Sequence, residues 1–291
     1  MRLGAHMSAA GGLHKAYERG REAGCETMLI FTKSNRQWKA KPLTDEDIEQ
    51  FKDATAEYQD IHPVAVHASY LINVGSSDDA LWEKSFRALK VEVERCEALE
   101  IPFLTFHPGA HVGAGEETGL ANIARALQRL LAETEGFKTT VCLENMAGAG
   151  TTLGYKFEHL AYLLENGGEN GESGRLGVCF DTCHALASGY DIRTPEAYDA
   201  TMSEFDSVVG LDNIKCFHFN DSKYDLGERK DRHDHIGEGF VGAQGFANFL
   251  NDSRWAHHAA HLETPKTETD DDGNEIDMDV VNLERLRSLV E

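Results

Sequence analysis

Four side chains that can bind metal ions or transfer protons recur at a constant interval in this sequence of 291 residues. Successive members are 37 residues apart in the segments FLTFHP, VCLEN, GVCFD and CFHFND: His107, Glu144, Asp181 and His218. Each follows a short apolar run that is typical of a buried β-strand. One strand–helix unit of a parallel barrel has this length, so the spacing predicts four successive strands that present one such group each at the same end.

Other strand ends and loops carry groups of the same kinds. His67 ends the strand-like run VAVHAS, and Glu263 ends HLET. His184 lies in FDTCHA, while Asp231 and His233 lie in DRH. The whole set therefore has five histidines, two aspartates and two glutamates: His67, His107, His184, His218, His233, Asp181, Asp231, Glu144 and Glu263.

Imidazole and carboxylate groups together are the usual ligands of catalytic zinc and of other divalent first-row metals. Nine such groups exceed the needs of one four-coordinate ion, and with bridging they suit two or three ions. Paired ions lower the pKa of water and neutralise phosphoryl oxygens. The set therefore predicts hydrolysis, with phosphate esters as the natural substrates.

Several alternatives stay open at this point. A lone His or Asp at a strand end more often forms a cap or a hydrogen bond than a metal bond. That interpretation weakens when six strand ends converge, because charged groups gathered without cations are costly. Cys179 and Cys183 leave a thiolate ligand open, although core packing is favoured, and His6 is either a ligand or a partner of one. Four further histidines are expected not to be ligands: His235, His257, His258 and His261.

The elements that would position these groups alternate regularly along the chain. Strands are expected at residues 3–6, 27–32, 64–69, 103–107, 139–144, 176–181, 216–220 and 260–263. Helices are expected at residues 14–24, 44–58, 78–99, 119–135, 156–166, 194–209, 243–251 and about 280–290. This order predicts an α/β fold, a single (β/α)₈ TIM barrel over residues 1–291 with the metal cluster at its C-terminal mouth. Residues 167–174 and 267–279 are expected to be plain surface loops, and the acidic second one lacks EF-hand spacing.

Composition limits the other properties. The six cysteines follow no regular framework, there is no run of 18 apolar residues, and the first residues do not resemble a secretion signal. We therefore expect a cytoplasmic monomer without a membrane partner. The 50 acidic and 28 basic residues give a formal charge of -22, which taken alone argues against nucleic acid. The excess either reflects a surface adapted to high salt or lies on helices remote from a basic face.

Basic residues do gather locally. The segment TKSNRQWKAKP carries Lys33, Arg36, Lys39 and Lys41 around Trp38, without an acidic residue. Basic side chains interleaved with an aromatic ring are typical of contacts with a nucleic-acid backbone.

A second basic cluster and two bulky residues adjoin the expected ligands. Arg229, Lys230 and Arg232 surround the DRH motif. Tyr70 and Leu71 follow His67 in SYLIN and would either wedge between bases or pack under a loop.

Taken together, these motifs closely resemble endonuclease IV, the family of zinc-dependent apurinic/apyrimidinic endonucleases of base excision repair. The resemblance extends from residue 4 to residue 264. It rests on the blocks GAHMSAAGG, FTKSNRQW, HASYLIN, FHPG, LEN, GVCFDTCHA, GYD, HFND, DRHDHIGEG and HLET. Ala68 in HASYL, where relatives often have Asp, and the long acidic loop at 267–279 depart from the pattern without touching an expected ligand.

The resemblance implies a deoxyribonuclease IV of the phage-T4-induced type with three zinc ions, which Mn²⁺ or Co²⁺ can replace. These ions would be held in turn by His67, His107 and Glu144; by Glu144, Asp181, His218 and Glu263; and by His184, Asp231 and His233. Hydroxide would attack the phosphodiester 5′ to an abasic site in duplex DNA and leave a 3′-hydroxyl and a 5′-deoxyribose phosphate. Glu144, shared by two ions, is the expected catalytic residue.

The resemblance also implies a DNA-binding face. In the family, the positions of Arg36, Tyr70 and Leu71 enter the DNA stack or minor groove while the abasic sugar is flipped out. The basic segments add the other expected DNA contacts, which are Lys33, Trp38, Arg229 and Arg232.

Two other classes of protein remain as alternatives. A metal-dependent sugar isomerase or epimerase uses the same barrel with strand-end Glu, Asp and His residues, normally with one or two metals. The additional triad of His184, Asp231 and His233, together with the basic segment, favours the nuclease. A non-catalytic metal or nucleic-acid binder is disfavoured, because so many ligands around open coordination positions are typical of catalysis.

Overall fold

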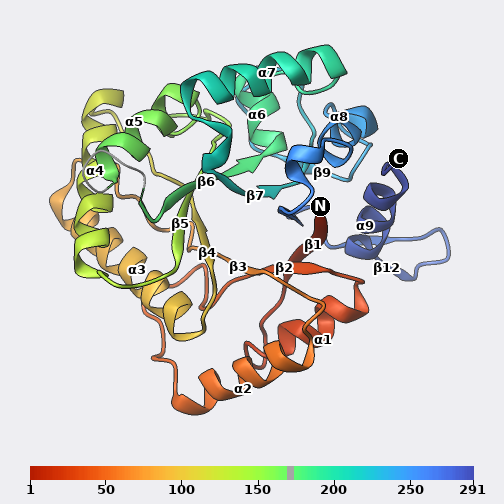
Figure 1. The fold of residues 1–291 in the computed structure, drawn as a ribbon, viewed down its shortest axis with the longest axis horizontal. Helices are drawn as coiled ribbons and strands as arrows, with labels where there is room; N and C mark the ends of the chain where they lie inside the picture. Colours follow the sequence, from red (N-terminus) through yellow and green to blue (C-terminus); the bar gives the residue numbers. More distant parts are fainter. Residues whose placement is uncertain (169–173) are drawn as a thin grey trace.

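Eight parallel strands close into a barrel in the order β1-β10-β7-β6-β5-β4-β3-β2, which confirms the predicted fold. The computed structural model describes residues 1–168 and 174–291. Helices surround the barrel on its outside (Figure 1). The barrel strands are β1 (Arg2–Met7), β2 (Thr27–Ile30), β3 (Val64–His67), β4 (Phe103–Phe106), β5 (Thr140–Glu144), β6 (Leu176–Asp181), β7 (Ile214–His218) and β10 (Ala259–Leu262).

The outer layer follows the strands in chain order. Its helices are α1 (Lys15–Glu22), α2 (Asp45–Glu57), α3 (Asp79–Ala98), α4 (Glu116–Glu133), α5 (Phe157–Gly167), α6 (Thr182–Ser188), α7 (Pro195–Val208), α8 (Gly242–Leu250) and α9 (Met278–Ser288), with short 3-10 turns η1 (Leu211–Asn213) and η2 (Ser253–Trp255). The expected start of α2 is confirmed in detail, because Thr44 and Asp47 form a reciprocal capping box.

The structure adds elements that were not predicted. α6 follows β6 directly and carries His184. Two short hairpins also form, one from β8 (Asp221–Ser222) and β9 (His233–Asp234) and the other from β11 (Thr267–Thr269) and β12 (Glu275–Asp277). The prediction of a plain loop at 267–279 was therefore wrong. Of the other predicted loop, residues 169–173 lie outside the described residues.

The alternation of side chains along each strand divides them between two environments. Outward-facing apolar residues pack against the helices in one continuous core. Inward-facing residues fill the barrel, where Cys142, Cys179 and Cys216 cluster. All six cysteines are unpaired and buried, as expected. Within the described parts of the chain, no helix combines the length and apolar character needed to cross a bilayer.

Candidate metal centre

The ends of the strands bring the nine predicted ligands to one mouth of the barrel. In the sheet register, Asp181 lies opposite His218 on the neighbouring strand, so both side chains reach the same height. Glu144 ends β5 and is completely buried. The ligand atoms of the nine residues fall into three close groups, within each of which they all lie within 4.8 Å of one another.

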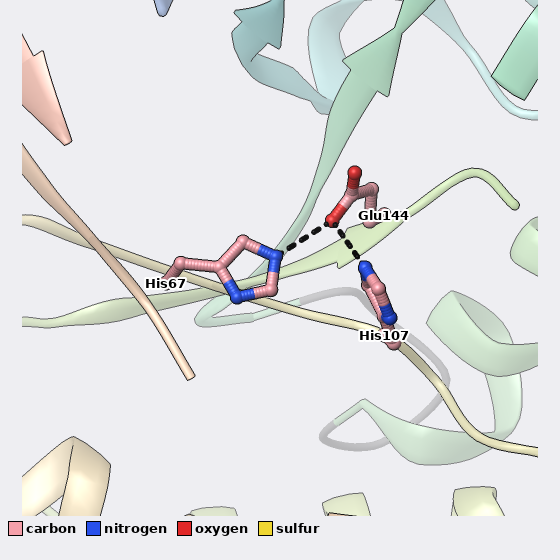
Figure 2. Close-up of side chains that lie close together, drawn as sticks. All are labelled: His67, His107 and Glu144. Carbon is pink, nitrogen blue, oxygen red and sulfur yellow. Dashed lines mark hydrogen bonds and ion pairs between the residues drawn. The ribbon is translucent and has the colours of Figure 1, made fainter. Parts of the chain in front are cut away.

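The first group joins strands β3, β4 and β5. His67 Nε2 lies 3.1 Å from Glu144 Oε2, and His107 Nε2 lies 3.4 Å from the same oxygen. Figure 2 shows both imidazoles converging on this carboxylate. Because two ring nitrogens approach one carboxylate oxygen, the group has the close packing of nitrogen and oxygen donors that a metal ion requires.

The second group is formed by Glu144, Asp181, His218 and Glu263. His218 Nδ1 lies 3.1 Å from Glu144 Oε1 and also 3.1 Å from Glu263 Oε2. Glu144 thus turns one oxygen to each of the first two groups, which is the arrangement expected of a bridging ligand.

The third group lies nearest to solvent. His184 Nε2 is 3.3 Å from Asp231 Oδ2, and His233 Nε2 is 3.4 Å from Asp231 Oδ1. The side chain of Asp231 is 40% exposed, whereas those of Glu144 and His184 are almost fully buried. An ion in this group would therefore be the most accessible of the three.

One alternative grouping involves sulfur. Cys183 lies close to Asp181 and His233, so a thiolate ligand at this position stays open. Burial raises the pKa of the Cys183 thiol to about 12, which keeps it protonated unless a cation binds. Cys179 instead packs with the other cysteines inside the barrel.

The carboxylates and imidazoles of the cluster shift one another's pKa values. Burial alone would raise the pKa of Glu144, but the charges of His218 and His107 hold it well below its ordinary value. Burial alone would lower the pKa of His218, but the carboxylates of Glu263 and Glu144 raise it well above its ordinary value. A divalent ion binds the neutral imidazole, so metal binding at His218 would be coupled to release of its proton.

Unused nitrogen atoms provide an independent test of fit to a metal. The Nε2 atoms of His184, His218 and His233 are buried, and none has an aligned hydrogen-bond partner among the described residues. Buried polar atoms are normally hydrogen-bonded, so several unsatisfied lone pairs in one cluster are unusual. These three atoms belong to expected ligands and fit metal coordination, whereas the other such atoms of the described residues belong to His6, Lys33, His258 and His261.

The remaining histidines lie outside the three groups. His6 Nδ1 forms a 2.9 Å contact with Glu263 Oε1, which fits a partner of a ligand better than a ligand. His261 Nε2 pairs with Thr27 Oγ1, and His235 contacts Asn282 and Glu268. None of the four histidines expected not to be ligands takes part in a candidate group among the described residues.

Two asparagines beside the ligands were missed in the sequence. Asn145 donates from Nδ2 to the main-chain oxygen of Asp181 at 3.0 Å and accepts from its N–H at 2.7 Å. Asn220 donates to the carboxylate of Asp181. Both lie in the motifs LEN and HFND, so their adjacency to ligands was the available signal.

The aromatic residue expected to enter DNA stands over the first group. Tyr70 is 51% exposed, and its ring centroid lies 5.0 Å from that of His67 and 5.2 Å from that of His107. Leu71 beside it is half-buried. Tyr70, His107 and Arg232 line one cavity of about 590 Å³ over the cluster.

The basic segment after β2 is firmly attached to α3. Arg95 donates from Nε to Thr32 Oγ1 at 3.1 Å and from a guanidinium nitrogen to the main-chain oxygen of Lys41 at 3.0 Å. Ser69 Oγ donates to the main-chain oxygen of Asn35 at 2.7 Å. Both ends and the middle of the segment are thus fixed, while Arg36 remains exposed.

Lys33 departs from its expected role as a DNA contact. Its Nζ lies 2.9 Å from Glu92 Oε1, and the two side chains are 4% and 1% exposed. The ammonium group is therefore enclosed by protein instead of facing a phosphate. We correct its assignment to a buried ion pair that holds the segment on α3.

The other expected DNA contacts, Trp38, Arg229 and Arg232, are partly or fully exposed. Trp38 packs under Lys84, whose Nζ lies 4.1 Å from the ring centroid. Arg229 lies over Tyr155 with its guanidinium carbon 5.0 Å from the ring centroid. Arg229 and Arg232 are both exposed.

Comparisons with known proteins place this geometry in context. A family profile described as a xylose isomerase-like TIM barrel matches residues 17–285. A probable endonuclease 4 of Chloroflexus aggregans is 52% identical over 289 residues, which cover 99% of this chain and 98% of that protein.

Two solved structures have a similar fold. The crystal structure of endonuclease IV from Thermus thermophilus superposes with a TM-score of 0.83 at 32% identity, covering 99% of this chain and 98% of the other. A D-tagatose 3-epimerase-like protein superposes with a TM-score of 0.71 at 17% identity, over 99% of this chain and 96% of the other. The second likeness shows a shared fold only.

Proposed function

This chain belongs to the endonuclease IV family, and from that premise we propose that it is a DNA-repair endonuclease acting at abasic sites. It would hydrolyse the phosphodiester 5′ to the lesion in duplex DNA and leave a 3′-hydroxyl and a 5′-deoxyribose phosphate. The observation that carries the proposal is the third group of His184, Asp231 and His233 beside the two groups that share Glu144.

Three zinc ions suit the three groups. The proposed holders are His67, His107 and Glu144; Glu144, Asp181, His218 and Glu263; and His184, Asp231 and His233. Zinc is preferred because the donors are imidazoles and carboxylates, although Mn²⁺ or Co²⁺ accept the same ligands. Bound ions would supply activated water and neutralise charge developing on the phosphate.

The side chains around the cluster would select the lesion. Tyr70 stands beside the first group and, with the adjacent Leu71, would fill the space left when an abasic sugar turns out of the helix. Flipping costs least where a base is missing, because no stacking is lost. Arg36, Arg229 and Arg232, whose side chains reach solvent, would contact phosphates on either side.

A duplex with one abasic site at a known position tests the proposal. We expect a single nick 5′ to the lesion, whose 3′ end a DNA polymerase can extend without further processing. An undamaged duplex of the same sequence is the control. If the zinc-loaded protein leaves the damaged strand intact over a wide range of salt, the proposal is wrong, and epimerisation of a ketose by the same preparation would favour the sugar epimerase.

The surface between the basic segment and α3 leads to a second prediction, which concerns DNA binding. Helices of a parallel barrel begin at the mouth, so the first turns of α3 lie beside the basic segment. A groove of about 520 Å³ between them is lined by Trp38, Lys39, Lys84 and Arg87, with Glu83 as its acidic residue. In a chain of charge -22, this surplus of positive charge fits the backbone of the DNA flank.

Replacing Lys84 and Arg87 together by Gln should therefore weaken binding of a long abasic duplex. The slope of log Kd against log salt concentration should fall by about 2, roughly one for each phosphate that the variant no longer neutralises. The matched control replaces Lys52 and Lys138 by Gln, because both residues lie at the opposite end of the barrel, where Lys52 Nζ donates to Glu100 and the main-chain N–H of Lys138 donates to Glu97. An unchanged slope in the α3 variant would exclude this path for the DNA.

A further inference from the structure

A completely buried amide connects three neighbouring strand ends at the metal centre. Asn220 lies two residues beyond His218 at the end of β7, between β6 and β10 in the barrel order. Its Nδ2 donates to Asp181 Oδ2 at 2.7 Å. Its Oδ1 accepts from the main-chain N–H of Glu263 at 2.8 Å. One side chain thus contacts two of the three acidic residues of the second group, the carboxylate of Asp181 and the main chain of Glu263.

The main chain of Asn220 is held in place as well. Its N–H donates to Thr182 Oγ1 at 2.9 Å, and the Thr182 hydroxyl donates to the main-chain oxygen of Asn220 at 2.8 Å. Thr182 follows Asp181 directly, so the amide is anchored to the same strand end that it contacts. The side chain therefore has little freedom to turn away from Asp181.

The carboxylate of Asp181 is oriented from two sides. Oδ1 accepts from the main-chain N–H of His184 at 2.7 Å, while Oδ2 accepts from Asn220. These bonds fix the plane of the carboxylate and leave its remaining lone pairs for a cation. Glu263 is constrained similarly, because its main-chain N–H donates to Asn220 Oδ1 and its Oε1 contacts His6 Nδ1.

The amide of Asn220 suits both contacts, because one requires a donor and the other an acceptor. An amide presents a donor and an acceptor on neighbouring atoms, whereas a carboxylate presents two acceptors. With two acceptors, one oxygen would face the carboxylate of Asp181 and repel it. The residue type at position 220 thus follows from the two groups that it joins.

We propose that Asn220 is a positioning residue that sets the separation and orientation of Asp181 and Glu263 for one ion, an inference that rests on the metal centre of the proposed function. Hydrogen-bonding partners of metal ligands typically contribute 10–100-fold to metal affinity. Asn220→Ala should therefore weaken binding of one ion per chain by about that factor and leave the other two within about threefold.

Titration of the metal-free protein with Co²⁺ tests this directly, because the visible absorption of Co²⁺ reports its ligand geometry. We expect the Asn220→Ala protein to lose or shift the absorption of one of the bound ions, with its affinity measured against a competing chelator. No DNA is needed, so a failure of the proposed nuclease activity and a failure of this inference would be seen separately.

Two further variants separate positioning from general stability. Asn122→Ala removes an amide hydrogen bond to the main-chain oxygen of Ser76 at 3.0 Å in the outer layer and should leave the Co²⁺ spectrum unchanged. Asn220→Asp keeps the acceptor for the Glu263 N–H but loses the donor to Asp181. This variant replaces Asn220→Ala in the Co²⁺ titration if the alanine variant does not fold. Wild-type spectra and affinities in both Asn220 variants would overturn the proposal, as would Co²⁺ binding to Asn220→Asp that is tighter than wild type.

Discussion

Glu144→Gln is expected to lower the rate of cleavage at an abasic site by about 10³-fold or more while the barrel stays folded. The substitution keeps the volume of the side chain in a completely buried position. It replaces a carboxylate oxygen by an NH₂ group, which cannot bind a cation. Since Oε2 faces His67 and His107, and Oε1 faces His218, both of the first two groups are weakened at once.

Single-turnover cleavage of an abasic duplex, with circular dichroism and thermal unfolding, measures this effect. The midpoint of unfolding of the metal-free variant should stay within about 2 °C of wild type, equivalent to roughly 1 kcal/mol for a chain of 291 residues. Glu97→Gln is the matched control, because Glu97 accepts main-chain hydrogen bonds from Lys138 and Thr139 at the opposite end of the barrel. Cleavage by Glu144→Gln at a tenth of the wild-type rate or faster would show that Glu144 is not a shared ligand.

Removal of metal is expected to abolish cleavage and to lower the thermal stability of the protein. The mouth holds four carboxylates, and the Nε2 atoms of three candidate ligands there lack aligned partners among the described residues. Each ion that binds only the folded chain, at a concentration about 1,000 times its Kd, stabilises it by about 4 kcal/mol. The unfolding midpoint should therefore fall after dialysis against a chelator and recover, together with activity, when Zn²⁺ is returned.

Elemental analysis completes this experiment. We expect close to three ions per active chain, and Mg²⁺ alone should not restore activity, since it prefers all-oxygen ligands. Full activity in protein that retains less than one ion per chain would refute metal-dependent hydrolysis. Such a result would leave the barrel and the family membership untouched.

Much of the fold was predictable because its signals are local. The barrel strands are short apolar runs, and six of the eight end at or just before a candidate ligand. Four of these ligands recur every 37 residues, so Asp181 and His218 could be placed at neighbouring strand ends. α6 escaped prediction because its seven residues are too few for a helical period to show. The β11–β12 hairpin escaped because its strands are exposed and acidic, without the alternation of a half-buried sheet.

The site was predictable to the extent that residue type decides the role. The nine candidate ligands could be found from chemistry and spacing alone. The role of Lys33 could not, since its partner Glu92 lies on a helix that is distant in the sequence. Asn220 was equally hidden, because its contacts with Asp181 and Glu263 come from three separate strand ends.

The attachment of the basic segment to α3 has a thermodynamic consequence. Loops that become ordered only on binding reduce affinity by the conformational entropy that they lose. Here Arg95, Ser69 and the buried Lys33–Glu92 pair already hold the segment in the free protein. Arg36 is thus presented on a rigid support. The conformational entropy of this segment is lost during folding, so its ordering does not reduce the free energy of DNA binding.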